Sequence, residues 1–414
     1  MSAPFDLLLH TCRLPDGTAG DIGCRDGRIV EIGALAGRAA HRTVDCAGSA
    51  VTPGLVESHI HLDKALLTDR APSVEGTVAE AIRVTGRAKQ GFTVDDIRRR
   101  ARAVLDMALA HGTTAMRSHV EVDPILGLMA LEALLPLREE YRPALDLQLC
   151  AFAQEGILQT PGTEALLAEA LRRGADLVGG CPYNDTDARA HVDIVFRLAT
   201  EFGVDADFHV DFNDEPKHLH VQYIAEQTRR HGWQGRVAVG HLTELAALPP
   251  VEQAAMIELL RDTGIGVIML PATDLYLMGR KDVRSPRRGL TPARRLLAAG
   301  VPVAAATNNV RNAFTPLGTA DLALMGFLAV IGCHMGTKQG ILEALAMLTD
   351  HPARILRLPD YGLAVGRRAD LVVWDAERAE DVIAALAPCR LAVKSGRVSI
   401  EHERAVKEHW RKTP

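Results

Sequence analysis

Aromatic residues are scarce in this chain of 414 residues, where Phe, Trp and Tyr make up 4% of the sequence. So few rings do not provide the stacking surface of a protein that binds single-stranded nucleic acid. The 47 Lys and Arg residues are balanced by 52 Asp and Glu residues and form no basic block. No apolar run reaches the roughly 20 residues that cross a bilayer. We therefore expect neither a nucleic-acid partner nor a membrane partner.

Closely spaced cysteine pairs are also absent. The seven cysteines are scattered and never form a Cys-x-x-Cys motif, which favours reduced structural thiols over a disulfide framework. The start of the chain, Met1 to Asp6, lacks the charged-then-apolar order of a signal peptide. These features predict a cytoplasmic protein.

Hydrophobic residues, at 47% of the sequence, are plentiful and fall into short strand-like runs. Helical patterns separate most of these runs: Thr93 is a candidate N-cap, a second helix follows Thr163 and stops at Gly174, and a third starts at Thr291-Pro292 with proline in its first turn. Eight strands alternating with helices predict a (β/α)8 barrel, which takes about 250 residues. The predicted strands are 55–61, 115–122, 146–152, 177–181, 205–212, 236–242, 266–271 and 301–308.

Both ends of the chain read as strands with glycine turns. We therefore predict that residues 1–52 and 360–405 form one small β-sandwich domain assembled from the two termini. The barrel would span residues 53–359. Two unrelated flanking hairpins are the alternative.

Four histidines fall where predicted barrel strands end. His59 and His61 lie two residues apart, so a strand would point both imidazoles to one face. His209 and His241 come at the ends of the fifth and sixth predicted strands. Chemistry in such barrels gathers at the C-terminal ends of the strands. The set therefore indicates a metal site more strongly than four separate core histidines.

The same residues, with several longer motifs, resemble the amidohydrolase superfamily and its cytosine deaminase-like branch. The resemblance covers nearly the whole chain. Its motifs are Ala151–Ile157, Glu164–Gly179, Met278–Asp282, Arg287–Thr291 and Pro316–Ala320.

This resemblance implies a metal-dependent hydrolase of non-peptide C–N bonds in a small N-heterocycle, cyclic amide or cyclic amidine. One divalent ion, zinc or iron, would be held by His59, His61 and His209, and its bound water would become hydroxide near neutral pH. His241 would polarise or orient the water and the substrate. No lysine ends the fourth strand to bridge two metals, so one ion is expected.

The resemblance also assigns substrate contacts. Gln154 corresponds to a residue that hydrogen-bonds the ring amide of the substrate, and Phe314 falls where the family has an aromatic wall. Lys64 follows the histidine pair, and we expect it either to meet an anionic group at the site or to be a solvated loop lysine. Arg117 and His119 share a face of the second strand, and a salt bridge inside the barrel or substrate binding could explain them.

Three positions depart from the family pattern. The strand-eight aspartate, a metal ligand and base, is Asn308 here, and the next acid is Asn309. The glutamate that shuttles protons is replaced by Phe212. An amide oxygen can coordinate a metal but cannot accept the proton of a water, and loss of one general acid or base typically costs about 10²–10⁴-fold in rate.

Two explanations follow from these departures. The site catalyses a different hydrolysis, with His241 as base, Asn308 near the metal, and Asp211, Asp214 or Glu215 as proton source. Alternatively, it binds a small molecule without turnover. Cytosine- or isocytosine-type deamination itself is a further alternative. We expect a small-molecule substrate, and relatives of this kind commonly form homo-oligomers.

Overall fold

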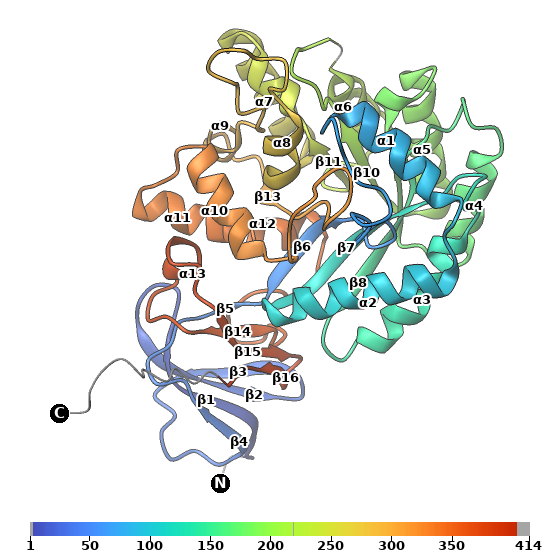
Figure 1. Cartoon of the computed structure of the whole chain (residues 1–414). Helices are drawn as coiled ribbons and strands as arrows, with labels where there is room; N and C mark the ends of the chain where they lie inside the picture. The colour runs from blue at the N-terminus through green and yellow to red at the C-terminus, as the bar shows by residue number, and fades with distance from the viewer. Residues whose placement is uncertain (1–2, 218, 404–414) are drawn as a thin grey trace, which may run out of the picture.

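A computed structural model describes residues 3–217 and 219–403 of the chain, and Figure 1 shows a barrel with a small β domain beneath it. Eight parallel strands form the barrel sheet and lie side by side in chain order. Each overlaps one of the eight predicted strands, although the last covers only Val303–Ala305 of the predicted 301–308, so the predicted barrel is confirmed. The strands are β6 (Leu55–Ile60), β7 (Thr113–Glu121), β8 (Asp146–Ala153), β9 (Leu177–Gly180), β10 (Asp205–Val210), β11 (Val237–His241), β12 (Gly266–Met269) and β13 (Val303–Ala305).

The first and last strands meet at Asn308. The Asn308 N–H donates to the His59 carbonyl oxygen at 2.8 Å, and the Asn308 carbonyl oxygen accepts from the His61 N–H at 2.9 Å. Asn308 has a left-handed backbone with φ of 62°. One residue therefore closes the barrel between the two histidines.

Helices surround the barrel. They are α1 (Val78–Lys89), α2 (Val94–Ala110), α3 (Met129–Tyr141), α4 (Thr163–Arg172), α5 (Ala188–Phe202), α6 (His220–His231), α7 (Pro250–Thr263), α8 (Pro271–Leu277), α9 (Ala293–Ala298), α10 (Leu322–Gly332), α11 (Lys338–Ala346), α12 (Asp350–Ile355) and α13 (Asp381–Ala384). No described helix combines the length and the apolarity needed to span a membrane.

The predicted helix ends are largely confirmed. The Thr93 side chain accepts from the Asp96 N–H at 3.1 Å at the start of α2, and Gly174 follows α4 with φ of 105°. The third start is shifted, because Pro292 has ψ of 60° and stands before α9 as its N-cap instead of in its first turn.

The small domain consists of two four-stranded sheets packed around Leu7, Ile22, Leu371 and Val393. Strand β5 pairs antiparallel with β14, which joins the two ends of the chain. This arrangement confirms a β-sandwich built from both termini and excludes two unrelated hairpins. Its boundaries, 1–52 with 360–405 against 53–359, stay a prediction. The sheets contain β1 (Phe5–Arg13), β2 (Ala19–Arg25), β3 (Arg28–Gly33) and β4 (Ala40–Asp45), and β5 (Val51–Pro53), β14 (Leu371–Trp374), β15 (Cys389–Lys394) and β16 (Arg397–Glu401).

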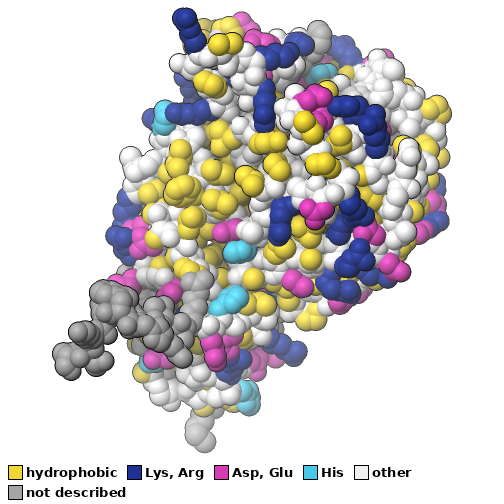
Figure 2. All heavy atoms as spheres, in the orientation of Figure 1, with side chains coloured by type: hydrophobic (Ala, Val, Ile, Leu, Met, Phe, Trp, Pro, Cys, Tyr) yellow, Lys and Arg dark blue, Asp and Glu magenta, His cyan; other side chains and the backbone are white. Residues whose placement is uncertain are grey.

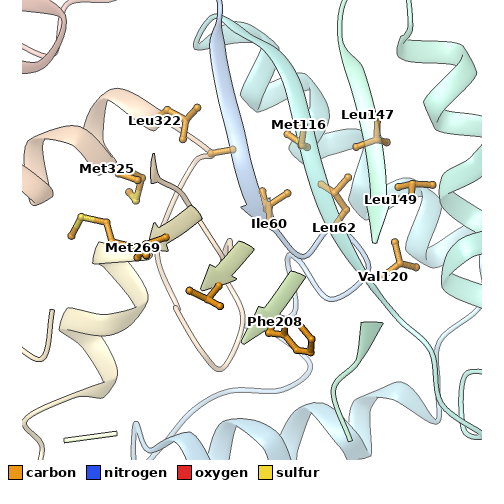
Figure 3. Close-up of a cluster of buried hydrophobic side chains, with 14 of the residues drawn as sticks. Ile60, Leu62, Met116, Val120, Leu147, Leu149, Phe208, Met269, Leu322 and Met325 are labelled. Atoms are coloured by element: carbon orange, nitrogen blue, oxygen red, sulfur yellow. The ribbon is translucent and has the colours of Figure 1, made fainter. Parts of the chain in front are cut away.

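The outer face of the barrel carries the main core. Ile60 of β6, Met116 of β7, Phe208 of β10 and Met325 of α10 belong to one buried hydrophobic cluster, part of which Figure 3 shows. Side chains alternate across a strand. A strand that buries Ile60 against the helices therefore turns His59 toward the barrel interior.

Helix α10 is apolar on more than its buried side. Phe327 and Leu328 are half-buried, and Ile331 is 56% exposed. Figure 2 shows hydrophobic side chains grouped on the face that contains α10. The homo-oligomer expected from the sequence stays a prediction, as does the cytoplasmic location.

A buried ion network ties α1 to the barrel. The Lys89 ammonium at the end of α1 lies 2.8 Å from Glu155 and 3.1 Å from Asp123, and it also pairs with Glu121. The carboxylates of Glu121 and Asp123 are buried with it. Their charges hold the pKa of Lys89 above its ordinary value against the opposing effect of burial.

Lys89→Met is expected to lower the free energy of unfolding by about 3–5 kcal/mol, because it leaves buried carboxylates without their cation. Urea denaturation of both proteins measures the difference. Lys338, whose exposed ammonium lies 3.4 Å from Glu380, is the matched control, and Lys338→Met should cost about 1 kcal/mol or less. Equal losses in the two variants would contradict a stabilising role for the network.

Candidate metal centre and active site

Three predicted histidines converge inside the barrel. His59 and His61 come from the end of β6, His209 comes from β10 across the barrel, and all three are buried. One ring nitrogen from each lies within 4.8 Å of the others, and the Nε2 atoms of His59 and His209 are 2.5 Å apart. The predicted ligand set is therefore brought together as a group.

The three rings suit a metal ion. Burial lowers the pKa of each well below its ordinary value, helped by His119 at His59, by Lys64 at His61 and by His59 at His209. Neutral imidazole is the form that binds metals. Three buried imidazoles that converge with one ring nitrogen each are a donor set that zinc and iron accept, so these residues fit a divalent ion.

Asn308 presents an oxygen beside these rings. Its Oδ1 is buried and has no partner within the described ranges. An unpaired buried acceptor costs about 1–3 kcal/mol, which a cation or a bound water would recover. This position fits the predicted role of Asn308 as a neutral metal ligand, and that role stays a proposal.

A carboxylate not predicted from the sequence supports His241. Asp274 is fully buried in the first turn of α8, and its Oδ1 lies 2.8 Å from Nδ1 of His241. Burial raises the pKa of Asp274, and the neighbouring His241 opposes this rise. The His241 Nε2 makes no hydrogen bond to a described residue and is therefore left free for chemistry. The sequence contained one sign of this role for Asp274, namely an aspartate within one helical turn after the seventh predicted strand.

The predicted proton donors lie elsewhere. Asp211 is buried, and its two oxygens accept from the backbone N–H groups of His220 and Val221 at 2.8 and 3.2 Å, so it caps the start of α6. The Asp214 Oδ1 accepts from the Gly279 N–H, and Glu215 pairs with Arg287. The structure thus gives Asp211, predicted as catalytic, a structural task instead.

An aromatic ring occupies the place of the family's glutamate. Phe212 stacks on His241 with ring centroids 3.9 Å apart and an angle of 28°. Phe212 and Phe314 also pack with Ala81 of α1 in one hydrophobic cluster. Helix α1 therefore covers the residues that surround His241, consistent with its place in Figure 1.

Lys64 is not a solvated lysine. It is 2% exposed, and its Nζ lies 2.7 Å from Glu121 and donates to the Gln154 Oε1 at 3.0 Å. The same ammonium lies 4.9 Å from the centre of the Phe314 ring. Three residues predicted to contact substrate, Lys64, Gln154 and Phe314, are thus neighbours.

Asn309 is held by an amide pair. Its Oδ1 accepts from the Asn312 Nδ2 at 2.7 Å, and that nitrogen also donates to the Lys64 carbonyl oxygen at 3.1 Å. This contact places Asn309 next to the Lys64 segment, and the contact of Asn309 and Phe212 with substrate stays a prediction.

A second polar layer lies beside the three converging histidines. Arg117 lies 2.8 Å and His119 lies 3.3 Å from the buried Asp207 carboxylate, and the His119 ring centroid is 4.0 Å from that of His59. Of the two explanations for Arg117 and His119, the salt bridge inside the barrel is confirmed.

Comparison with known proteins agrees with this geometry. A model of the amidohydrolase family matches residues 42–400. The N-isopropylammelide isopropyl amidohydrolase of Pseudomonas sp. (strain ADP) is 29% identical over 412 residues, which cover 97% of this chain and 99% of the relative. The pterin deaminase of Rhizobium rhizogenes (strain K84) is 31% identical over 382 residues, covering 91% and 87%.

A solved structure is also similar. The 5-methylcytosine deaminase from Klebsiella pneumoniae, liganded with 5-fluorocytosine, has a TM-score of 0.92 and 30% sequence identity, covering 97% of this chain and 99% of that one. The fold and the histidine cluster define a barrel hydrolase with a divalent metal site, of the class that acts on non-peptide C–N bonds. The chain belongs to the amidohydrolase family. The family and the enzyme class expected from the sequence are thereby confirmed.

Proposed function

We propose that this chain hydrolyses a C–N bond in a small N-heterocycle, cyclic amide or cyclic amidine, using one zinc or iron ion per chain. The observation that carries the proposal is the buried His241–Asp274 pair beside three histidines that can hold the ion. Imidazole ligands suit both metals. No lysine ends β9 to bridge a second ion.

The protein side chains would divide the remaining work. An ion held by the histidines would lower the pKa of a bound water from about 15.7 to about 7. His241 directs its Nδ1–H at Asp274, so its Nε2 can accept the proton of the attacking water as the C–O bond forms. The same proton then passes to the leaving nitrogen as the C–N bond breaks. Asn308 cannot take this proton, which leaves His241 as the base.

Deamination of a cytosine- or isocytosine-type ring is the second candidate. The similarity to the 5-methylcytosine deaminase supports it. Asn308 and Phe212 argue against it, because they replace the two acids that such a reaction uses.

A panel of N-heterocycles tests the proposal, with ammonia or amine release measured on zinc- and iron-loaded protein. Asp274→Asn is expected to lower kcat by about 10²–10⁴-fold with little change in KM, because it removes the partner that orients the base. Binding of ring compounds without product from the wild type would overturn the hydrolase and leave a small-molecule binder.

Two controls separate orientation from general damage. Asp262→Asn changes an exposed carboxylate paired with Arg261 and should leave kcat unchanged. Nitrogen-15 spectra of labelled histidine should place the His241 proton on Nδ1 in the wild type and alter this signal in Asp274→Asn. An unaltered His241 signal would contradict the positioning role of Asp274.

A further inference from the structure

The thiol of Cys181 lies against one of the three converging histidines. Its sulfur is 3.5 Å from the Nδ1 atom of His209, and both side chains are buried. We propose that Cys181 is a positioning residue: its sulfur accepts a hydrogen bond from the His209 Nδ1–H and so directs the Nε2 lone pair of that ring at the metal ion. This inference rests on the proposed function, which requires the ion.

The backbone brings the two side chains together. Cys181 directly follows β9, and its N–H donates to the Ala153 carbonyl oxygen at 3.2 Å, which continues the pairing with β8. On the other side, Gly180 is paired with Phe208 of β10, so the next residues, Cys181 and His209, are neighbours. Phe208 belongs to the outer hydrophobic cluster. Because side chains alternate along a strand, His209 and the thiol beside it face the barrel interior.

His209 differs from the other two histidines in having a partner on Nδ1. The Nδ1 atoms of His59 and His61 have no hydrogen-bond partner among the described residues. The Nε2 atom of His209 lies 2.5 Å from that of His59, so these two nitrogens face the same point. A histidine that binds a metal through one ring nitrogen usually donates a hydrogen bond from the other. Cys181 stands where His209 needs that acceptor.

The other contacts of the sulfur indicate the direction of this hydrogen bond. The Gln154 Nε2 donates to the sulfur at 3.3 Å, because the Oε1 of the same amide is occupied by Lys64. The sulfur donates to the Tyr183 hydroxyl oxygen at 3.7 Å. A thiol has one hydrogen to donate. The contact with His209 therefore uses a proton carried by the ring.

A thiol holds the ring mainly through geometry. The carboxylates that commonly accept from a metal-binding histidine also make its imidazole more basic, whereas a thiol sulfur is only a weak acceptor. Cys181 therefore limits rotation of the His209 ring and selects one of its two neutral forms, with no negative charge added beside the ion.

Nitrogen-15 spectra of the full-length, metal-free protein with labelled histidine test the hydrogen bond directly. The signals of His209 are identified by their absence from the spectrum of His209→Ala. We expect the proton on Nδ1 in the wild type and a mixture of the two neutral forms in Cys181→Ala. A wild-type His209 with its proton on Nε2 would overturn the proposal, and this result does not depend on the folding of any Cys181 variant.

Zinc affinity, measured by competition with a chromophoric chelator, is the second readout. Loss of a residue that supports a metal ligand typically costs about 10–100-fold in affinity, which is the loss we expect for Cys181→Ala. Cys181→Ser keeps an acceptor and should recover most of this loss.

Cys150→Ala is the matched control, because it removes the same atom from a buried cysteine of β8 whose sulfur contacts the Ala151 carbonyl oxygen. It should keep the wild-type affinity and the wild-type signals of His209. Equal losses of affinity in Cys150→Ala and Cys181→Ala would refute the positioning role.

Neither readout depends on turnover. A proton on Nδ1 of His209 and a weakened zinc site in Cys181→Ala, without product from any ring, would keep the positioning role and remove the hydrolase. Ring hydrolysis by the wild type, with unchanged zinc affinity in Cys181→Ala, would remove the positioning role and keep the hydrolase.

Discussion

The His59→Ala, His61→Ala double variant is expected to lose its metal, whereas the wild type should contain about one zinc or iron ion per chain. Changes to residues that only support metal ligands typically cost about 10–100-fold in metal affinity. Removing two of three imidazole ligands should exceed that range. Metal analysis by mass spectrometry after purification without chelators measures the occupancy.

The fold should survive this change, because the hydrophobic cluster outside β6 is untouched. Circular dichroism of the variant checks this expectation. His41→Ala, at an exposed histidine of β4, is the control and should keep full metal content. A double variant that retains one ion per chain would refute the ligand assignment.

The second large effect is a gain of activity. Asn308→Asp combined with Phe212→Glu is expected to raise ammonia release from cytosine by about 10²–10⁴-fold for each acid restored. The aspartate would supply a charged metal ligand and base, and the glutamate would replace the ring that now stacks on His241. Steady-state assays on both single variants and the double variant give the two contributions.

Metal content should be measured on the same proteins. Full occupancy in the wild type would show that three histidines suffice for binding. Little metal in the wild type but near-full occupancy in Asn308→Asp would show that the asparagine weakens the site and would favour a small-molecule binder. No gain of activity in the double variant would mean that the substrate site is shaped for another ring.

The barrel and the convergence of its three histidines were predictable because both follow from strand periodicity. Alternation along β6 buries Ile60 on one side and turns His59 and His61 to the other. Parallel strands bring their C-terminal ends to one edge, so His209 could be placed near them without knowledge of the contacts between strands.

The orientation of individual carboxylates was not predictable in the same way. Asp211 ends a strand, yet its oxygens face the start of α6. Asp274 stands beyond a strand and reaches His241 because α8 begins immediately there. Lys64 is buried because Glu121 on the next strand compensates its charge. These features depend on contacts across the barrel, which no local pattern encodes.

The backbone at Asn308 restricts how evolution can alter this centre. Its φ of 62° lies in the left-handed region, which asparagine, aspartate and glycine enter most readily. Other side chains would add about 1–2 kcal/mol of strain at the seam that joins β6 to β13. Exchange between aspartate and asparagine changes the charge beside the histidines and keeps the seam closed. Within this lineage, replacing aspartate with asparagine at position 308 is therefore the change of chemistry that disturbs the backbone least, because it exchanges one side-chain oxygen for nitrogen.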